Sequence, residues 1–230
     1  MGAERYDGAA VVDAGAVIVP ARGLLFDADG VLVDSDESIE RAWLRWAHRW
    51  DHDPAAVLAG IHGRRSDDTV ALLVDHADRA RALADIDRYE LEDVGTVTAC
   101  PGAAELLASL PAGRWAVVTS GKRALAGARL TAAGLPLPSV LVPADEVPRG
   151  KPDPAGYLAG AAGLGLPAGD CVVLEDSPAG ITAGAAAGAV VVGVSERALA
   201  SDVPVVVRDL RGLTWDGAAL HLPAEALLRG

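Results

Sequence analysis

The stretch GLLFDADGVLVDS, residues 23–35, is the part of the chain that decides the fold. Its first four residues, Gly23–Phe26, form an apolar run typical of a buried strand. Asp27 and Asp29 follow where that strand is expected to end, and Gly30 allows the chain to turn. Open parallel sheets place their chemistry in loops beyond the carboxyl ends of the strands. Two carboxylates there suit a metal ion with a nucleophile, or a nucleophile with a proton donor, although a polar turn would have the same sequence.

The composition indicates a globular protein with a sizeable core. Of the 230 residues, 51% are hydrophobic, which argues against disorder. The formal net charge of −12 argues against nucleic acid as a partner, and it requires any phosphate site to be locally positive. The two cysteines, Cys100 and Cys171, fit a reducing compartment, so we expect a cytoplasmic protein.

Two apolar stretches could be mistaken for membrane or targeting segments. Residues 177–195 carry no charge, but they divide into a helix-like half and a strand-like half, which predicts a buried helix–strand unit. Residues 14–21 are short and are preceded by acidic residues, which is wrong for a signal peptide. We expect an extra edge strand at residues 14–21 and no association with a membrane.

Strand-like and helix-like segments alternate over most of the chain. Strands are predicted at residues 23–26, 114–119, 140–142, 171–175, 190–194 and 204–207. Helices are predicted at residues 103–110, 124–133, 154–163 and 178–187. This alternation is typical of βαβ units with right-handed crossovers, so the fold class is α/β with a parallel sheet.

One segment, residues 36–100, interrupts the alternation with helices and no convincing strand. Apolar residues recur there at helical spacing: Ile39, Trp43, Trp46, Ala47 and Trp50. Such a stripe is typical of the inner face of a helical bundle. The bundle would be inserted after the first strand of the sheet, and Pro101-Gly102 would mark the return of the chain.

Polar residues follow a second predicted strand. Residues 115–118 run into Thr119-Ser120-Gly121-Lys122, which precedes a predicted helix. A hydroxyl pair and a glycine at such a position offer hydroxyl and backbone N–H groups to an anion. An ordinary helix cap would contain the same residue types.

Two further loops carry charged side chains. Lys151 lies in the run GKPDP, residues 150–154, where two prolines stiffen the backbone and favour a fixed charge for phosphate over a solvated lysine. Glu175 and Asp176 stand where the strand at 171–175 ends, and they suit either a helix N-cap or oxygen ligands for Mg²⁺. A doubly wound sheet would gather all four loops at one edge. Their combined groups are those that phosphoryl transfer requires.

The chain resembles the haloacid dehalogenase superfamily in four motifs, in the order typical of that family. They are FDADG (26–30), VVTSG (117–121), GKPDP (150–154) and VLEDSPAGI (173–181). The resemblance implies a Rossmannoid α/β core, residues 1–35 and 102–230, with an inserted helical C1 cap domain, residues 36–101, as in the β-phosphoglucomutase-like subgroup. Within it, the segments HGRR (62–65), WAVVTSG (115–121) and GKPDPAGYLAG (150–160) are most similar to glycerol-phosphate and 2-deoxyglucose-6-phosphate phosphatases.

The resemblance also implies roles for individual residues. Asp27 would attack phosphorus and form an aspartyl phosphate. Asp29 would protonate the leaving alkoxide and then activate water. Thr119 would bind a phosphoryl oxygen, assisted by backbone N–H groups at Ser120 and Gly121, and Lys151 would neutralise the charge shared by Asp27 and phosphate.

The same resemblance implies a magnesium site and a specificity loop. Mg²⁺ would be held by Asp27, the backbone carbonyl of Asp29 and Asp176, with Glu175 binding either directly or through its neighbours. In the cap, Arg64 or Arg65 would bind the substrate, although two solvated arginines would look the same in sequence.

These expectations lead to one function and two alternatives. We expect a Mg²⁺-dependent phosphatase that hydrolyses a small sugar or polyol phosphomonoester. A β-phosphoglucomutase-like phosphomutase would keep the same four motifs, and a non-catalytic binding protein on this scaffold would have no need to keep all of them. The expected partner is a small phosphorylated metabolite, and we expect a monomer, with a homodimer as the alternative.

Overall fold

The computed structural model describes residues 4–6, 10–13, 16–61 and 63–230. The α-helices are α1 (Asp36–Arg49), α2 (Pro54–Leu58), α3 (Ser66–Leu73), α4 (Arg79–Glu92), α5 (Ala103–Ser109), α6 (Arg123–Ala132), α7 (Ala155–Gly163) and α8 (Pro178–Ala186). The strands are β1 (Glu4–Tyr6), β2 (Ala10–Asp13), β3 (Ala16–Pro20), β4 (Gly23–Phe26), β5 (Val33–Asp34), β6 (Thr98–Ala99), β7 (Trp115–Val118), β8 (Leu141–Val142), β9 (Cys171–Glu175), β10 (Val190–Val194), β11 (Val206–Val207), β12 (Thr214–Trp215), β13 (Ala219–Leu222) and β14 (Leu227–Arg229).

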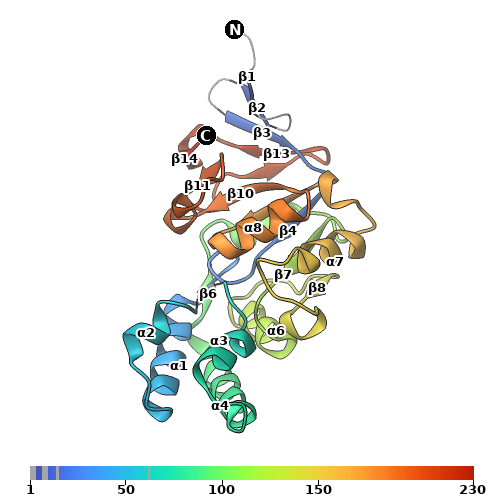
Figure 1. Ribbon diagram of the computed structural model, residues 1–230. Coiled ribbons are helices and arrows are strands. Elements are labelled where there is room, and N and C mark those ends of the chain that lie inside the picture. Colours follow the sequence, from blue (N-terminus) through green and yellow to red (C-terminus); the bar gives the residue numbers. More distant parts are fainter. Residues whose placement is uncertain (1–3, 7–9, 14–15, 62) are drawn as a thin grey trace.

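The main sheet has seven strands in the order β14-β11-β10-β9-β4-β7-β8. All pairs except β11–β14 are parallel, which confirms the predicted α/β class. Helices cover both faces, with α7 and α8 on the one that faces the viewer in Figure 1. The strand β4 shows why both faces are buried, because Leu24 and Phe26 pack into one core cluster and Leu25 into the other.

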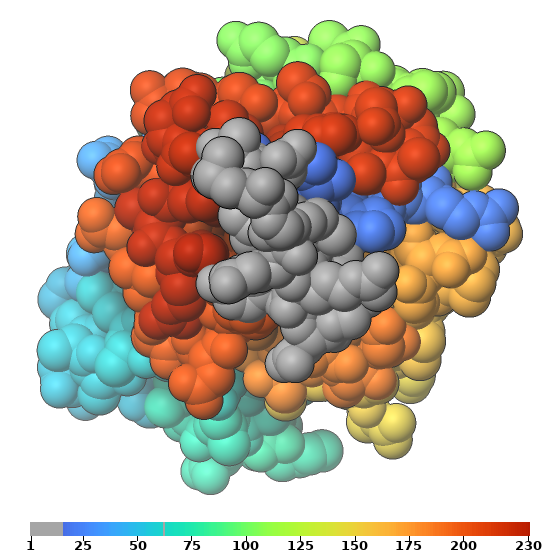
Figure 2. Space-filling model, turned by 90° about the horizontal axis from the view of Figure 1, so that it is seen from above, coloured from blue at the N-terminus to red at the C-terminus, as the bar shows by residue number. Residues whose placement is uncertain are grey.

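A second sheet was not predicted. Its strands run β1-β2-β3-β13-β12 and pair antiparallel. The strand predicted over residues 14–21 is present as β3, with residues 14 and 15 outside the described part, but the expectation of an edge strand was wrong. It pairs with β2 on one side and β13 on the other, because the C-terminal strands return to it. Figure 2 shows these C-terminal residues in red beside β3 in blue.

The helices α1–α4 form a cluster of their own at the far end of the molecule from the second sheet (Figure 1). The tryptophan stripe lies inside it, as predicted, and Trp46 is fully buried with its indole N–H donating to the Ala82 carbonyl at 2.9 Å. The short strands β5 and β6 pair antiparallel where the chain enters and leaves this segment. The expectation of no strand in residues 36–100 therefore misses β6. The division into core and cap at residues 35/36 and 101/102 stays a prediction.

The uncharged stretch 177–195 folds as predicted, into the helix α8 and the strand β10. In the part of the chain that the structure describes, no helix has the length and apolarity that a membrane crossing needs.

Candidate active site

The strands at the centre of the main sheet bring three of the four predicted motifs together. β4 lies between β9 and β7 and runs parallel to both. Asp27 follows β4, and its backbone N–H donates to the Leu174 carbonyl of β9 at 3.0 Å. Thr119 follows β7 and Asp176 follows β9. Parallel strands end at the same edge of a sheet, so these side chains share one site.

The fourth motif reaches this site through Lys151. Its Nζ lies 2.6 Å from Asp27 Oδ1 and 2.6 Å from Glu175 Oε1. Burial raises the pKa of Asp27 well above 3.8, and the charge of Lys151 offsets this only in part. Burial alone would lower the pKa of Lys151, but the charges of Asp27 and Glu175 outweigh it and raise that pKa. The ammonium group therefore stays charged beside the carboxylate of Asp27.

Glu175 is fully buried, and both of its carboxylate oxygens are occupied. Besides Lys151, Oε1 accepts a hydrogen bond from the Tyr157 hydroxyl at 3.1 Å. Oε2 accepts from the Ser177 backbone N–H at 2.8 Å and from the Ser177 hydroxyl at 3.0 Å. Ser177 is the N-cap of α8, and a Cβ at Gly180 would lie 1.5 Å from Glu175 Oε1. These contacts favour a role for Glu175 in orienting Lys151.

Asp29 is held by a chain of side chains that crosses from the sheet domain to α4. Its Oδ1 accepts from the Ser35 hydroxyl at 2.6 Å and from Arg129 NH1 at 3.0 Å. Arg129 NH2 donates to Glu90 Oε1 at 3.1 Å. Burial raises the pKa of Glu90, and Arg129 offsets part of that increase. Burial lowers the pKa of Arg129, but the charges of Asp29 and Glu90 outweigh it, so this guanidinium stays charged.

The oxygens of Asp27, Glu175 and Asp176 lie within 4.8 Å of one another, which suits a hard divalent cation. Burial and the charge of Glu175 raise the pKa of Asp176 to about 7, although Arg197 and Lys151 counteract them. The guanidinium of Arg197 donates to Asp176 and also to Asp36, at the start of α1. A crowded set of buried carboxylates is what a magnesium ion would stabilise, so these residues fit the predicted metal.

The phosphate-binding loop predicted at residues 119–121 is in contact with the cap segment. Thr119 is buried, and its hydroxyl accepts from the Gly121 backbone N–H at 3.0 Å. The Ser120 hydroxyl donates to the Gly63 carbonyl at 2.9 Å. Gly63 has a φ of +71°, and a Cβ there would lie 2.5 Å from Ser177 Oγ. The loop before α3 therefore lies directly on the motifs at the edge of the main sheet.

The two arginines of the cap loop have different environments. Arg64 is exposed and lines a cavity beside Asp29, and its guanidinium makes no hydrogen bond or ion pair with the residues that the structure describes. Arg65 donates to the Asp68 carboxylate at 2.8 and 2.9 Å and to the Val147 carbonyl at 3.4 Å. Arg65 thus contacts the loop that carries Lys151 rather than the cavity.

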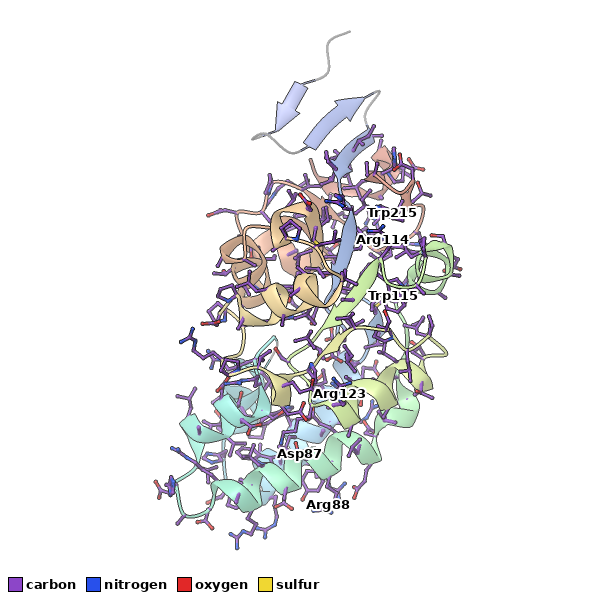
Figure 3. The ribbon with its side chains drawn as sticks, turned by 90° about the vertical axis from the view of Figure 1, so that its right-hand side faces the viewer. Asp87, Arg88, Arg114, Trp115, Arg123 and Trp215 are labelled. Carbon is purple, nitrogen blue, oxygen red and sulfur yellow. The ribbon has the colours of Figure 1, made fainter. Side chains whose placement is uncertain are left out.

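A cavity of about 50 Å³ lies between the loops of the main sheet and the helical segment of residues 36–101. Its walls come from both parts of the chain: Asp27, Asp29, Asp176, Ser120, Gly121, Leu125, Arg129 and Arg197 from the first, and Asp36, Ile39, Trp43, Ile61, Gly63, Arg64, Ser66 and Glu90 from the second. Figure 3 shows the same junction from the side, with Asp87 on α4 and Arg123 on α6, where the two helices lie together. An ion pair closes it, with Lys122 Nζ 2.6 Å from Asp87.

Sequence reasoning missed Arg129, Glu90, Arg197 and Tyr157. Arg129, Glu90 and Tyr157 lie within helices and not at strand ends, so the pattern that located the motifs did not include them. Arg197 does follow the end of β10, but as a lone arginine it belonged to none of the four motifs. Arg129 had one signal, because it lies on the buried face of α6 with Leu125, Ala126 and Leu130, where a charged residue needs a partner.

The comparison with known proteins identifies the family to which this site belongs. A model of the haloacid dehalogenase-like hydrolases matches residues 21–188. The chain belongs to this family. Hexitol phosphatase A from Escherichia coli (strain K12) is 43% identical over 185 residues, 77% of this chain and 86% of that protein. The 2-deoxyglucose-6-phosphate phosphatase 1 of Saccharomyces cerevisiae is 33% identical over 186 residues, 68% of this chain and 72% of that protein. The predicted family is thereby confirmed.

Solved structures agree on the fold of this haloacid dehalogenase-like hydrolase. The β-phosphoglucomutase of Clostridium difficile superposes with a TM-score of 0.73 at 21% identity, covering 83% of this chain and 92% of that one. At such identity the likeness concerns the fold alone and not the reaction.

Proposed function

We propose that this protein is a phosphatase that hydrolyses a small sugar or polyol phosphomonoester through an aspartyl phosphate on Asp27. The observation that carries the proposal is the position of Asp27, buried with Lys151 Nζ 2.6 Å from Oδ1 and with Asp176 in the same carboxylate cluster. A carboxylate and a phosphate are both negatively charged and repel each other in water. A fixed cation beside the buried carboxylate offsets this repulsion, so the carboxylate can approach the phosphate.

The residues of the chain divide the reaction between them. One oxygen of Asp27 attacks phosphorus, the P–O bond to the alcohol breaks, and the proton of Asp29 goes to the leaving oxygen. In the second step water attacks phosphorus, its proton goes to the Asp29 carboxylate, and the bond between phosphorus and Asp27 breaks. Lys151 neutralises charge in both steps, while Thr119, Ser120 and Gly121 bind the phosphoryl oxygens.

We assign Mg²⁺ to Asp27, Asp176 and the backbone carbonyl of Asp29. Bound there, the ion would supply positive charge against the phosphate oxygens. Glu175 stays on Lys151, Tyr157 and Ser177 and supports the site without binding the ion.

The substrate class follows from the cap and from the relatives. A cavity of about 50 Å³ holds only a few water molecules, so the cap must move away to admit a sugar phosphate. Arg64, exposed at the cavity wall, is the cap residue that we expect to bind the substrate. The 43% identity to a hexitol phosphatase favours a hexitol phosphate over other polyol phosphates. The protein would act in the cytoplasm as a monomer on a free metabolite.

A panel of phosphomonoesters tests the proposal. The purified protein is incubated with Mg²⁺ and with hexitol, glycerol, hexose and nucleoside phosphates, and released phosphate is measured, with EDTA as the metal-free control. We expect release from a polyol or sugar phosphate and loss of release in EDTA. The absence of phosphate release from every compound would contradict the proposal. Isomerised hexose phosphate without free phosphate, seen by phosphorus NMR, would indicate the phosphomutase instead.

A further inference from the structure

We propose that Arg129 is the positioning residue for Asp29 and that Glu90 of the cap completes its placement when the cap is closed. The proposal rests on the proposed phosphatase function, because it concerns how Asp29 is oriented in that reaction. It extends that function to two residues, on α6 and α4, that the four motifs do not contain.

The two carboxylate oxygens of Asp29 have different surroundings. Oδ1 accepts from the Ser35 hydroxyl at 2.6 Å and from Arg129 NH1 at 3.0 Å. Within the described part of the chain, Oδ2 has no hydrogen-bond donor, and Asp29 lines the cavity. Two donors on one oxygen fix the plane of the carboxylate, which leaves Oδ2 as the oxygen that exchanges a proton with the leaving group or with water.

Arg129 is suited to hold two acids at once. It is only 2% exposed, and its NH1 and NH2 groups donate to different carboxylates, those of Asp29 and Glu90. A planar guanidinium can serve two partners in fixed geometry, whereas a lysine offers one flexible point charge. Glu90 is also buried and comes from the cap, so the full set of contacts exists only with the cap closed.

The step that depends most on this placement is hydrolysis of the aspartyl phosphate. Water must lose a proton to Asp29 Oδ2 as its oxygen bonds to phosphorus and the Asp27–phosphorus bond breaks. The preceding step can proceed without Asp29 when the leaving group is a good one, such as p-nitrophenolate. This substrate therefore separates the two steps, because it releases its coloured product in the first.

Stopped-flow measurement of p-nitrophenol release with the Mg²⁺-loaded protein tests the proposal. For Arg129→Met we expect a full burst of one nitrophenol per active site at the wild-type rate, followed by a steady state slower by about 10²-fold. The values of kcat and KM would fall together, so kcat/KM would stay near that of the wild type. Arg129→Lys should recover part of kcat. Arg123→Met is the matched control, since this exposed arginine of the same helix, which Figure 3 labels, pairs with Glu146 instead.

A structural role alone would give a different result. It would lower the burst amplitude or kcat/KM in parallel with kcat, and that outcome would overturn the proposal. If Arg129→Met does not fold, Glu90→Gln tests the proposal in its place, because glutamine keeps the side-chain volume. We expect this variant to give the same burst with a smaller decrease in kcat. A Glu90→Gln protein with wild-type kcat would then contradict the proposal. If the wild type releases neither nitrophenol nor phosphate, the phosphatase function itself has failed.

Discussion

Lys151 Nζ lies 2.6 Å from Asp27 Oδ1 and bridges this aspartate to a second acid, Glu175. The other two aspartates of the site are held in the same way. Arg129 bridges Asp29 to Glu90, and Arg197 bridges Asp176 to Asp36. Each cation thus stabilises one carboxylate of the site and is itself fixed by another acid. These cations offset the negative charge of the site, so an anionic substrate can bind there although the chain has a net charge of −12.

Asp27→Asn should abolish turnover and leave the fold intact. The amide lacks the nucleophilic oxygen, so no phosphoryl group can be transferred to it. The buried site loses a carboxylate whose pKa burial had raised, so the loss of its charge should not unfold the protein. Phosphate release and circular dichroism measure the two effects. Turnover of the variant at the wild-type rate would show that Asp27 is not the nucleophile.

Gly180→Ala should destabilise the protein and lower its activity together. A Cβ at this position would lie 1.5 Å from Glu175 Oε1, so the glutamate would have to move away from Lys151. Overpacking of this kind costs about 1–3 kcal/mol in free energy of unfolding. Urea denaturation measures the loss, and kcat reports the displacement of Lys151.

Gly127→Ala is the matched control for this substitution. It also lies within a helix, but its Cβ would meet nothing within 4 Å. Because alanine is the better helix former, we expect the free energy of unfolding to rise by about 0.5–1 kcal/mol with kcat unchanged. Equal effects of the two substitutions would mean that the contact with Glu175 is not what matters at Gly180.

Gly63→Ala should impair cap closure. The residue has a φ of +71°, and a Cβ there would lie 2.5 Å from the Ser177 hydroxyl. The left-handed conformation costs about 1–2 kcal/mol for a residue with a Cβ, so we expect kcat/KM to fall by about tenfold. Steady-state kinetics measure this. Gly95→Ala is the control, because nothing lies within 4 Å of its Cβ, and an equal loss there would contradict the explanation.

Cys100 should react slowly with alkylating agents in the folded protein. Burial, together with nearby acids such as Asp34, raises its pKa from 9.0 to about 12. The thiolate is the reactive form, so iodoacetamide labelling at pH 8 should be slower than in the denatured protein by about 10³-fold. The folded state holds this proton more tightly, so the stability from this group falls as the pH rises from 9.0 towards 12. Mass spectrometry after timed labelling measures the rate, and fast native labelling would contradict the prediction.

The motifs were predictable because each is local. An apolar run followed by acids, as at Gly23–Phe26 with Asp27 and Asp29, encodes both the strand and the group at its end. The topology of a parallel sheet then brings such ends together without further information. The tryptophan stripe of α1 was predictable for the same reason, because helical spacing is visible within one turn.

The second sheet and the pairing of Arg129 and Arg197 with the acids of the site were not predictable in this way. The strand β3 needed β13, about 200 residues further along the chain, to become an interior strand. The two cap arginines have the same sequence context, and only packing turned Arg65 to Asp68 and left Arg64 at the cavity.

The amino-acid sequence by itself determined the α/β class, the inserted helices and the four motifs, because strand ends, glycine turns and apolar periodicity are short-range properties of the chain. The family resemblance also placed Lys151 beside Asp27, but only the tertiary structure decided that Arg129 holds Asp29 and that Arg197 holds Asp176. Ion pairs such as Arg129 with Glu90 join residues 39 positions apart across two segments, and Coulomb energy depends on their distance in space, which no local pattern records.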